Sequence, residues 1–299
     1  MSSLTGWLNM RPNQQSLHLI SFASGQFEWR LTRRRFIREA KDSGFFTNVK
    51  VYGPADLAAI PHLSEGMRKG LLPFHEKGYG YWVWKPAIIL HHLESHMVDG
   101  EILVYMDVGF SIRSNVESKR TLESYIKKMR ASGPLFFQLP NLDIHHSKWS
   151  VIRTYADWGI AHSSRLKQTM GGLHFWRKDQ ESIATANDWL SLCLHNGGEL
   201  LTDPADGERN TSLIAHRHDQ SLLTLVVQKR NCPQLVDDTY HPENWWNAQA
   251  LKKPFLQTRL KGTMNLQELR SGSVFRRILR FCELVLFRLA RDLRNSWRS

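Results

Sequence analysis

The sequence predicts an α/β protein. Short apolar runs typical of buried strands alternate along the chain with longer stretches in which apolar residues recur at helical spacing. Glycine, proline and aspartate, which interrupt regular structure, separate many of these segments. With 299 residues, the chain is long enough for one large domain with a buried core, or for one domain with a tail.

The central stretch runs from residue 78 to 109, GYGYWVWKPAIILHHLESHMVDGEILVYMDVG. Pro86 suits the first turn of a helix, so Lys85 stands at a helix entrance. After a break, the apolar run 102–106 predicts a buried strand that ends at Asp107. Ligands of open α/β sheets bind beyond the carboxyl ends of strands, so Asp107 is placed for a metal or a sugar. A plain Asp-x-Gly turn is the alternative.

The run 17–23, LHLISFA, predicts the first buried strand. Its end is a place where a nucleotide base and ribose are commonly received, which makes Ser21, Phe22 and Ala23 candidate donor contacts. A first core strand without such a role explains them equally well.

The next segment, 31–43, is helical in pattern and carries a basic side that we expect to be solvated, with Arg33, Arg34, Arg35 and Arg38. Because this helix follows the first strand directly, Arg33 is a candidate contact for a diphosphate.

An aromatic cluster precedes Lys85. Tyr79, Tyr81, Trp82 and Trp84 are explained by core or loop packing, since aromatic side chains bury large areas. Trp84 also suits a wall against which a base or sugar ring lies.

Two further motifs follow in the second half of the chain. Gly171 and Gly172 precede an apolar strand at 173–176; they make a tight turn or let a ligand approach the backbone closely. Asp219 and Gln220 open a helix, where Asp219 is at least an N-cap.

This order of motifs resembles the GT-A glycosyltransferases, especially family 8, which includes glycogenin and the lipopolysaccharide galactosyltransferases of bacterial surface-glycan synthesis. In that family a strand ends in Asp-x-Asp, which binds a divalent metal and the donor diphosphate. This chain has Asp107, with Gly109 in place of the second acid. The family's Asp-Gln motif, which lines the donor sugar, is matched by Asp219 and Gln220.

The resemblance implies a GT-A, Rossmann-like mixed sheet flanked by helices over residues 1–260, followed by a tail over 261–299. It implies transfer of a sugar from a nucleotide-diphosphate sugar, with a UDP-sugar expected, to a glycan or lipid-linked glycan, with retention of configuration. Asp219 and Gln220 would be catalytic. Donor contacts are implied at Lys85, Gly109, Gly171 and Gly172, and a manganese or magnesium ion at Asp107 and His241.

The formal net charge of +12 implies an anionic partner: a nucleotide, nucleic acid or a membrane surface. A nucleic-acid-binding protein without catalytic activity is therefore the alternative function, although it leaves the ordered motifs unexplained. A metal-dependent phosphotransferase or nuclease built on Asp107 and Asp219 would usually need a denser cluster of carboxylates.

The tail over 273–297 has apolar residues at helical spacing among many arginines. It predicts an amphipathic helix on an anionic membrane surface, or else a helix docked on the domain or on a second subunit. The N-terminus lacks a secretory pattern, and the three cysteines form no disulfide framework. We therefore expect a cytoplasmic protein, peripheral on the inner face of the membrane.

Overall fold

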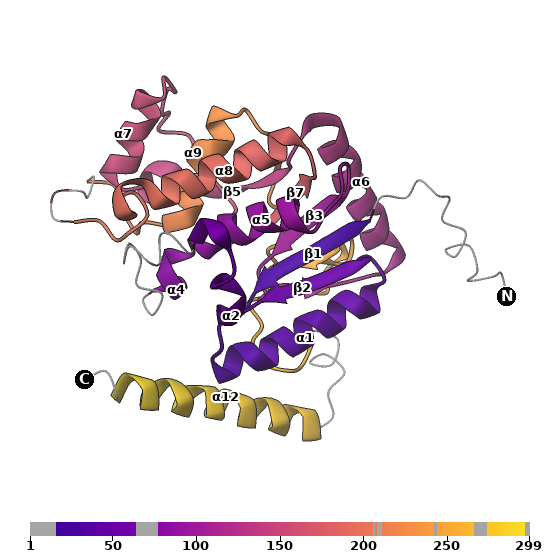
Figure 1. Ribbon diagram of the computed structural model, residues 1–299. Coiled ribbons are helices and arrows are strands. Elements are labelled where there is room, and N and C mark those ends of the chain that lie inside the picture. The colour runs from indigo at the N-terminus through magenta and orange to yellow at the C-terminus, as the bar shows by residue number, and fades with distance from the viewer. Residues whose placement is uncertain are drawn as a thin grey trace.

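The computed structural model describes residues 16–63, 77–205, 207, 211–241, 244–265 and 274–296. It is a mixed α/β structure in which helices lie on both faces of a central sheet, as Figure 1 shows. The predicted fold class, a mixed sheet flanked by helices, is confirmed.

The central sheet has the strand order β2-β1-β3-β7. Strands β2, β1 and β3 are parallel, and β7 runs antiparallel to β3. The bounds are β1 Leu17–Phe22, β2 Asn48–Tyr52, β3 Ile102–Met106 and β7 Leu173–Arg177. Because β1 and β3 are parallel neighbours, the residues that follow them meet at one edge of the sheet.

The position of β3 inside the sheet explains why its sequence is continuously apolar. Leu103 and Tyr105 belong to the core on one face of the sheet, whereas Val104 and Met106 belong to the core on the other. The first face is covered by α5 (Trp84–Ser95), α8 (Gln180–Leu194) and α9 (His218–Lys229), the second by α1 (Phe27–Ser43) and α6 (Val116–Ser132). A strand buried on both faces has no position for a polar residue until it ends at Asp107.

Among the described residues there are also two smaller sheets. One has the order β6-β5-β8 and meets β7 through a bridge between Leu135 and Phe175; the other pairs β4 with β9. Their bounds are β4 Ser111–Ile112, β5 Phe136–Leu142, β6 Lys167–Thr169, β8 Gln234–Val236 and β9 Phe255–Leu256. The other helices in the described part of the chain are α2 Pro54–Leu57, α4 Gly78–Tyr81, η2 Asp143–His145, α7 Trp149–Asp157, η3 His195–Gly197, α10 Ala248–Leu251 and α12 Val274–Ser296.

Helix boundaries follow local signals. Lys85 and Pro86 lie in the first turn of α5, as predicted. Helix α1 ends at Gly44, whose φ of 65° only glycine adopts readily. In the part of the chain that the structure describes, no helix has both the length and the apolar character needed to cross a membrane.

Candidate active site

The candidate site lies beyond the carboxyl ends of β1 and β3. Asp107 follows β3 directly, and its backbone N–H donates to the carbonyl of Gly172, 2.9 Å away, which extends the pairing of β3 with β7 by one step. The carboxylate is 43% exposed although the strand before it is fully buried. Asp107 is thus the point at which the core opens to solvent.

Lys85 connects three segments that are distant in sequence. Its ammonium Nζ lies 3.1 Å from Oδ2 of Asp219 and 3.6 Å from Oδ1 of Asp107, and it donates to the carbonyl of Gly171 at 2.7 Å. Only 5% of the Lys85 side chain is exposed. The sequence motifs on α5, at the end of β3, before β7 and on α9 therefore meet at one cation.

The two carboxylates differ in their surroundings. Asp219 is buried, and this burial raises the pKa of its carboxyl to about 6 against the opposing effect of Lys85. Burial by itself would lower the pKa of Lys85, but Asp107 and Asp219 outweigh it, so that this pKa is raised. Lys85 is therefore charged at neutral pH, and Asp219 is the group whose protonation changes near pH 6.

Tyr105 supports Asp107 from inside the sheet. Its hydroxyl donates a hydrogen bond of 2.5 Å to Oδ1 of Asp107, and its ring stacks on His174 with centroids 5.3 Å apart. Burial raises the pKa of Tyr105 well above its ordinary value, so the phenol keeps the proton that it donates. Oδ1 of Asp107 is held by Tyr105 and Lys85.

The paired glycines let these segments come close. A Cβ on Gly172 would lie 3.0 Å from Oδ2 of Asp107, and one on Gly171 would lie 3.3 Å from Cβ of Gln220. Gln220 accepts a hydrogen bond from the N–H of Gly171 and donates one to Gln168. Contacts within the protein thus account for both glycines; their place against a sugar stays a prediction.

Asp107 also lies at the wall of a pocket of about 780 Å³. Of the predicted donor contacts, Phe22, Ala23, Trp84 and Gly109 line it together with Asp107. Trp84 stacks on Phe22, with ring centroids 4.1 Å apart. The other lining residues are Ser24, Gln26, Trp29, Gly78, Tyr79, Trp82, Val108, Phe110, Gln257, Arg259 and Lys261.

The predicted residues grouped around Lys85, namely Lys85 itself, Gly171, Gly172, Asp219 and Gln220, do not line the pocket. Three further predicted residues belong neither to that group nor to the pocket wall. Ser21 is fully buried in β1, and the guanidinium of Arg33 donates to the carbonyl of Val51 on β2 at 3.0 Å. His241 donates through Nε2 to the carbonyl of Asp238 at 3.0 Å.

Of the two predicted metal ligands, Asp107 and His241, only Asp107 lines the pocket. Within residues 16–63, 77–205, 207, 211–241, 244–265 and 274–296, no three His, Cys, Asp or Glu side chains are grouped so that they could hold a metal ion. The described residues therefore do not form a protein-built metal centre around Asp107, and metal dependence stays a prediction.

Sequence reasoning missed one part of the pocket wall. Residues 257–261 contribute Gln257, Arg259 and Lys261, so this wall brings two cations. The segment passes close to Gly109, where a Cβ would lie 3.4 Å from Cα of Arg259. The segment has no periodic pattern and no motif; its only signal in the sequence is the pair of basic residues in QTRLKGT.

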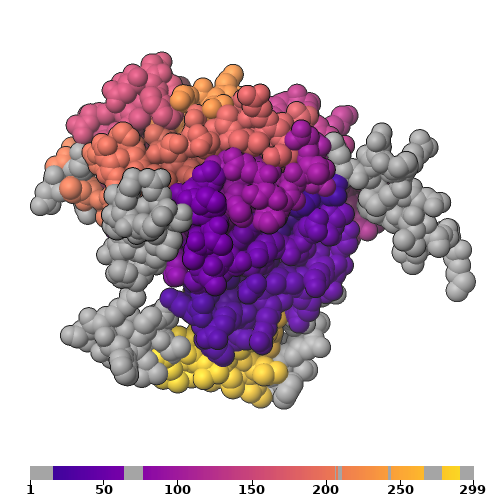
Figure 2. All heavy atoms as spheres, viewed as in Figure 1, coloured from indigo at the N-terminus to yellow at the C-terminus, as the bar shows by residue number. Residues whose placement is uncertain are grey.

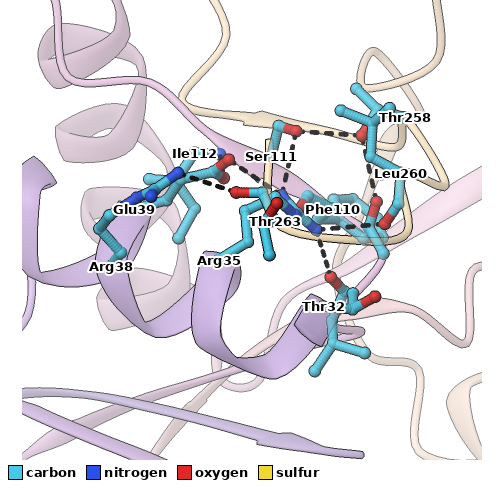
Figure 3. A network of polar contacts seen from close by, with 12 residues as sticks. Thr32, Arg35, Arg38, Glu39, Phe110, Ser111, Ile112, Thr258, Leu260 and Thr263 are labelled. Carbon is cyan, nitrogen blue, oxygen red and sulfur yellow. Dashed lines mark hydrogen bonds and ion pairs between the residues drawn. The ribbon is translucent and has the colours of Figure 1, made fainter. Parts of the chain in front are cut away.

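Arg35 fixes both walls, although its predicted place was the solvated side of α1. That prediction is wrong, because Arg35 is 1% exposed. Its guanidinium donates to the carbonyls of Val108 at 2.6 Å, Phe110 at 2.9 Å and Leu260 at 3.3 Å, and it pairs with Glu39 at 3.0 Å. Figure 3 shows this network, in which α1 holds the loop after Asp107 beside the segment 257–263.

No protein-family model matches this sequence, and a search among curated proteins found no match. Among solved structures, mouse xyloside xylosyltransferase 1 aligns with a TM-score of 0.43 and 11% identity, covering 81% of this chain and 97% of that one. A glycosyltransferase involved in glycosylation of the major capsid of PBCV-1 aligns with a TM-score of 0.39 and 12% identity, covering 81% and 91%. At these values neither likeness carries an argument about what this chain does.

Proposed function

We propose that this protein is a glycosyltransferase of the GT-A type that transfers a sugar from a nucleoside diphosphate sugar to a glycan or lipid-linked glycan. A UDP-sugar is the expected donor. One observation carries the proposal: Asp107, at the end of β3, joins the buried Lys85 and Asp219 pair to a pocket with aromatic and cationic walls. Such a site has separate places for a flat base, a diphosphate and a reacting sugar.

The diphosphate end of the donor requires positive charge, because a nucleoside diphosphate leaves during transfer. Arg259 lines the pocket and supplies that charge from the chain itself, and Lys261, which also pairs with Glu28 at 3.0 Å, lies beside it. Trp84 and Phe22, stacked on each other and mostly buried, form an apolar part of the pocket wall beside which the base would lie. These contacts orient the donor so that its anomeric carbon lies near Asp107.

The reacting sugar develops positive charge as the bond to the diphosphate breaks. Asp107 faces the pocket with one oxygen held by Tyr105 and Lys85, so its remaining oxygen is oriented before the donor arrives. Asp219 and Gln220 act from behind Lys85: Asp219 fixes the ammonium, and Gln220 fixes the backbone of Gly171. We expect retention of anomeric configuration, as in family 8.

The test is hydrolysis of a panel of nucleotide sugars by the purified protein, with manganese and with a chelator. We expect one donor to be cleaved, and the rate to fall at least about 100-fold in Asp107→Asn and in Asp219→Asn. Asp42→Asn, at an exposed position on α1, is the matched control and should keep the wild-type rate.

Two results would end the proposal. One is the absence of cleavage and of nucleotide-sugar binding under every metal condition. The other is binding of single-stranded nucleic acid that weakens steeply with salt while no nucleotide sugar binds, which would favour the nucleic-acid-binding alternative. The chelator arm separately decides metal dependence.

A further inference from the structure

Helix α12 lies along the outside of α1, and Figure 2 shows it as the outermost layer beneath the rest of the molecule. Phe287 on α12 contacts Phe27 on α1, with ring centroids 6.2 Å apart. Glu283 accepts hydrogen bonds from the backbone N–H and the hydroxyl of Thr263. Phe287 and Glu283 are 7% and 9% exposed, so they define the side of α12 that faces the protein.

The side turned away from the protein is apolar. Ile278, Phe281, Val285 and Leu289 are spaced by three or four residues and are 54%, 67%, 40% and 54% exposed. Leu279 and Leu286 extend this face at 44% and 50%. A helix at the surface of a soluble domain normally buries its apolar side. Here a charged side chain, Glu283, lies inward and the apolar row lies outward.

Charge distinguishes the possible occupants of this face. Between Val274 and Ser296 the sequence has six arginines and two acidic residues, in a chain of net charge +12. A second copy would bring a helix of the same sign against this one, whereas anionic lipid headgroups would be attracted to it. Outward apolar residues in an arginine-rich helix are typical of helices that lie in the interface of a bilayer.

We propose that α12 is an interfacial helix that docks the protein on an anionic membrane surface, with Ile278, Phe281, Val285 and Leu289 inserted at the boundary between headgroups and acyl chains. The inference is independent of the proposed enzymatic function. It has a consequence for that function, because Arg280 on α12 donates to the carbonyl of Lys261, which lines the pocket. A hydrogen bond thus links the helix that would lie on the membrane to the wall of the pocket.

The test is flotation of the full-length protein with vesicles of phosphatidylcholine alone, or of equal parts phosphatidylcholine and phosphatidylglycerol. We expect binding to the anionic vesicles to exceed binding to the neutral ones at least about tenfold, and to weaken with added salt. Phe281→Glu should reduce binding to anionic vesicles by about tenfold or more. Ile214→Glu, at a site 72% exposed and away from α12, is the control and should bind like the wild type.

The substitution at Phe281 removes no buried contact, so its unfolding curve should match that of the wild type. The proposal is overturned if the wild-type protein does not float with anionic vesicles, or if Phe281→Glu floats equally well. Sedimentation equilibrium tests whether a second copy of the chain covers this face instead. The face would be assigned to a second copy if the wild type is a dimer that does not bind vesicles, and if Phe281→Glu converts that dimer to a monomer.

Discussion

Lys85 is the residue on which the site depends, because two carboxylates from different elements rely on one buried ammonium. A carboxylate can remain charged when buried only with a partner, since the loss of hydration is not otherwise compensated. Tyr105 and Gly171 add hydrogen bonds that fix where the charges lie. The same contacts that stabilise the fold therefore orient the proposed chemistry.

Lys85→Met should lower the free energy of unfolding by about 3 to 5 kcal/mol at pH 8, because it leaves Asp219 buried without its partner. Urea denaturation measures the change. The matched control is Lys50→Met: Lys50 forms an ion pair of 2.7 Å with Asp56, but its side chain is 48% exposed. That loss should be about 1 kcal/mol or less. Equal losses in the free energy of unfolding of the two variants would show that burial does not make the Lys85 ion pair more stabilising than an exposed one.

Asp219 gives stability a pH dependence of defined sign. Burial raises the pKa of its carboxyl to about 6 in the folded protein, from 3.8. Between about pH 4 and 6 the unfolded chain loses this proton while the folded chain keeps it, so this contribution to stability falls as pH rises through that window.

The variant Asp219→Asn cannot titrate at this position. The free energy of unfolding of the wild type minus that of the variant should therefore decrease by about 2 kcal/mol from pH 4 to pH 6.5. Urea denaturation at several pH values measures this difference, in which most other titrating groups cancel. A difference that is flat, or that grows with pH, would contradict the raised pKa.

At the scale of elements, the sequence predicted the features that are determined by residues close together in the chain, such as strands and helix starts. The apolar run of β3 ending at Asp107 and the entry of α5 at Lys85 are local patterns, and both are present. The contact of Lys85 with Asp219 joins positions 134 residues apart, and no spacing in the sequence indicates it. Motif order suggested that the two belong to one site, but only the packing of α5 and α9 against one face of the sheet brings them together.

Arg35 shows why contacts between residues far apart in the sequence could not be predicted. It is one of four arginines, with Arg33, Arg34 and Arg38, that the pattern alone places on the solvated side of α1. Its burial depends on carbonyls from the loop after β3 and from residue 260, which lie far along the chain. The cations of the pocket, Arg259 and Lys261, escaped prediction for the same reason: their segment has no regular pattern and takes its place through contacts with distant residues.

Arg35→Met should destabilise the protein by about 3 to 5 kcal/mol, since it leaves Glu39 and several carbonyls buried without their donor. Arg34→Met, the exposed neighbour on the same helix, is the control and should change stability by about 0.5 kcal/mol or less. Hydrogen exchange should also accelerate in residues 108–112 of Arg35→Met. Unchanged exchange in that loop would mean that Arg35 does not hold the pocket wall.

At the scale of the whole molecule, the pocket and α12 are linked through the segment 257–263. Arg280 donates to the carbonyl of Lys261, and Glu283 holds Thr263. On the other side of the segment, the N–H of Gly262 donates to Thr32 on α1 at 2.9 Å. Both α1 and α12 therefore hold the pocket wall in place.

Arg280→Ala should weaken UDP binding by about fivefold or more without touching the pocket, because the wall formed by residues 257–261 loses its anchor on α12. Arg288→Ala is the matched control: it removes the same charge from the same helix at an exposed position. Isothermal titration with UDP measures both, and the unfolding curve of Arg280→Ala shows whether the domain stays intact. If the two variants bind UDP equally well, α12 does not support the pocket. Loss of affinity in Arg280→Ala alone would make α12 part of the proposed donor site. A membrane or partner that covers the apolar face of α12 would then also affect the binding of the nucleotide.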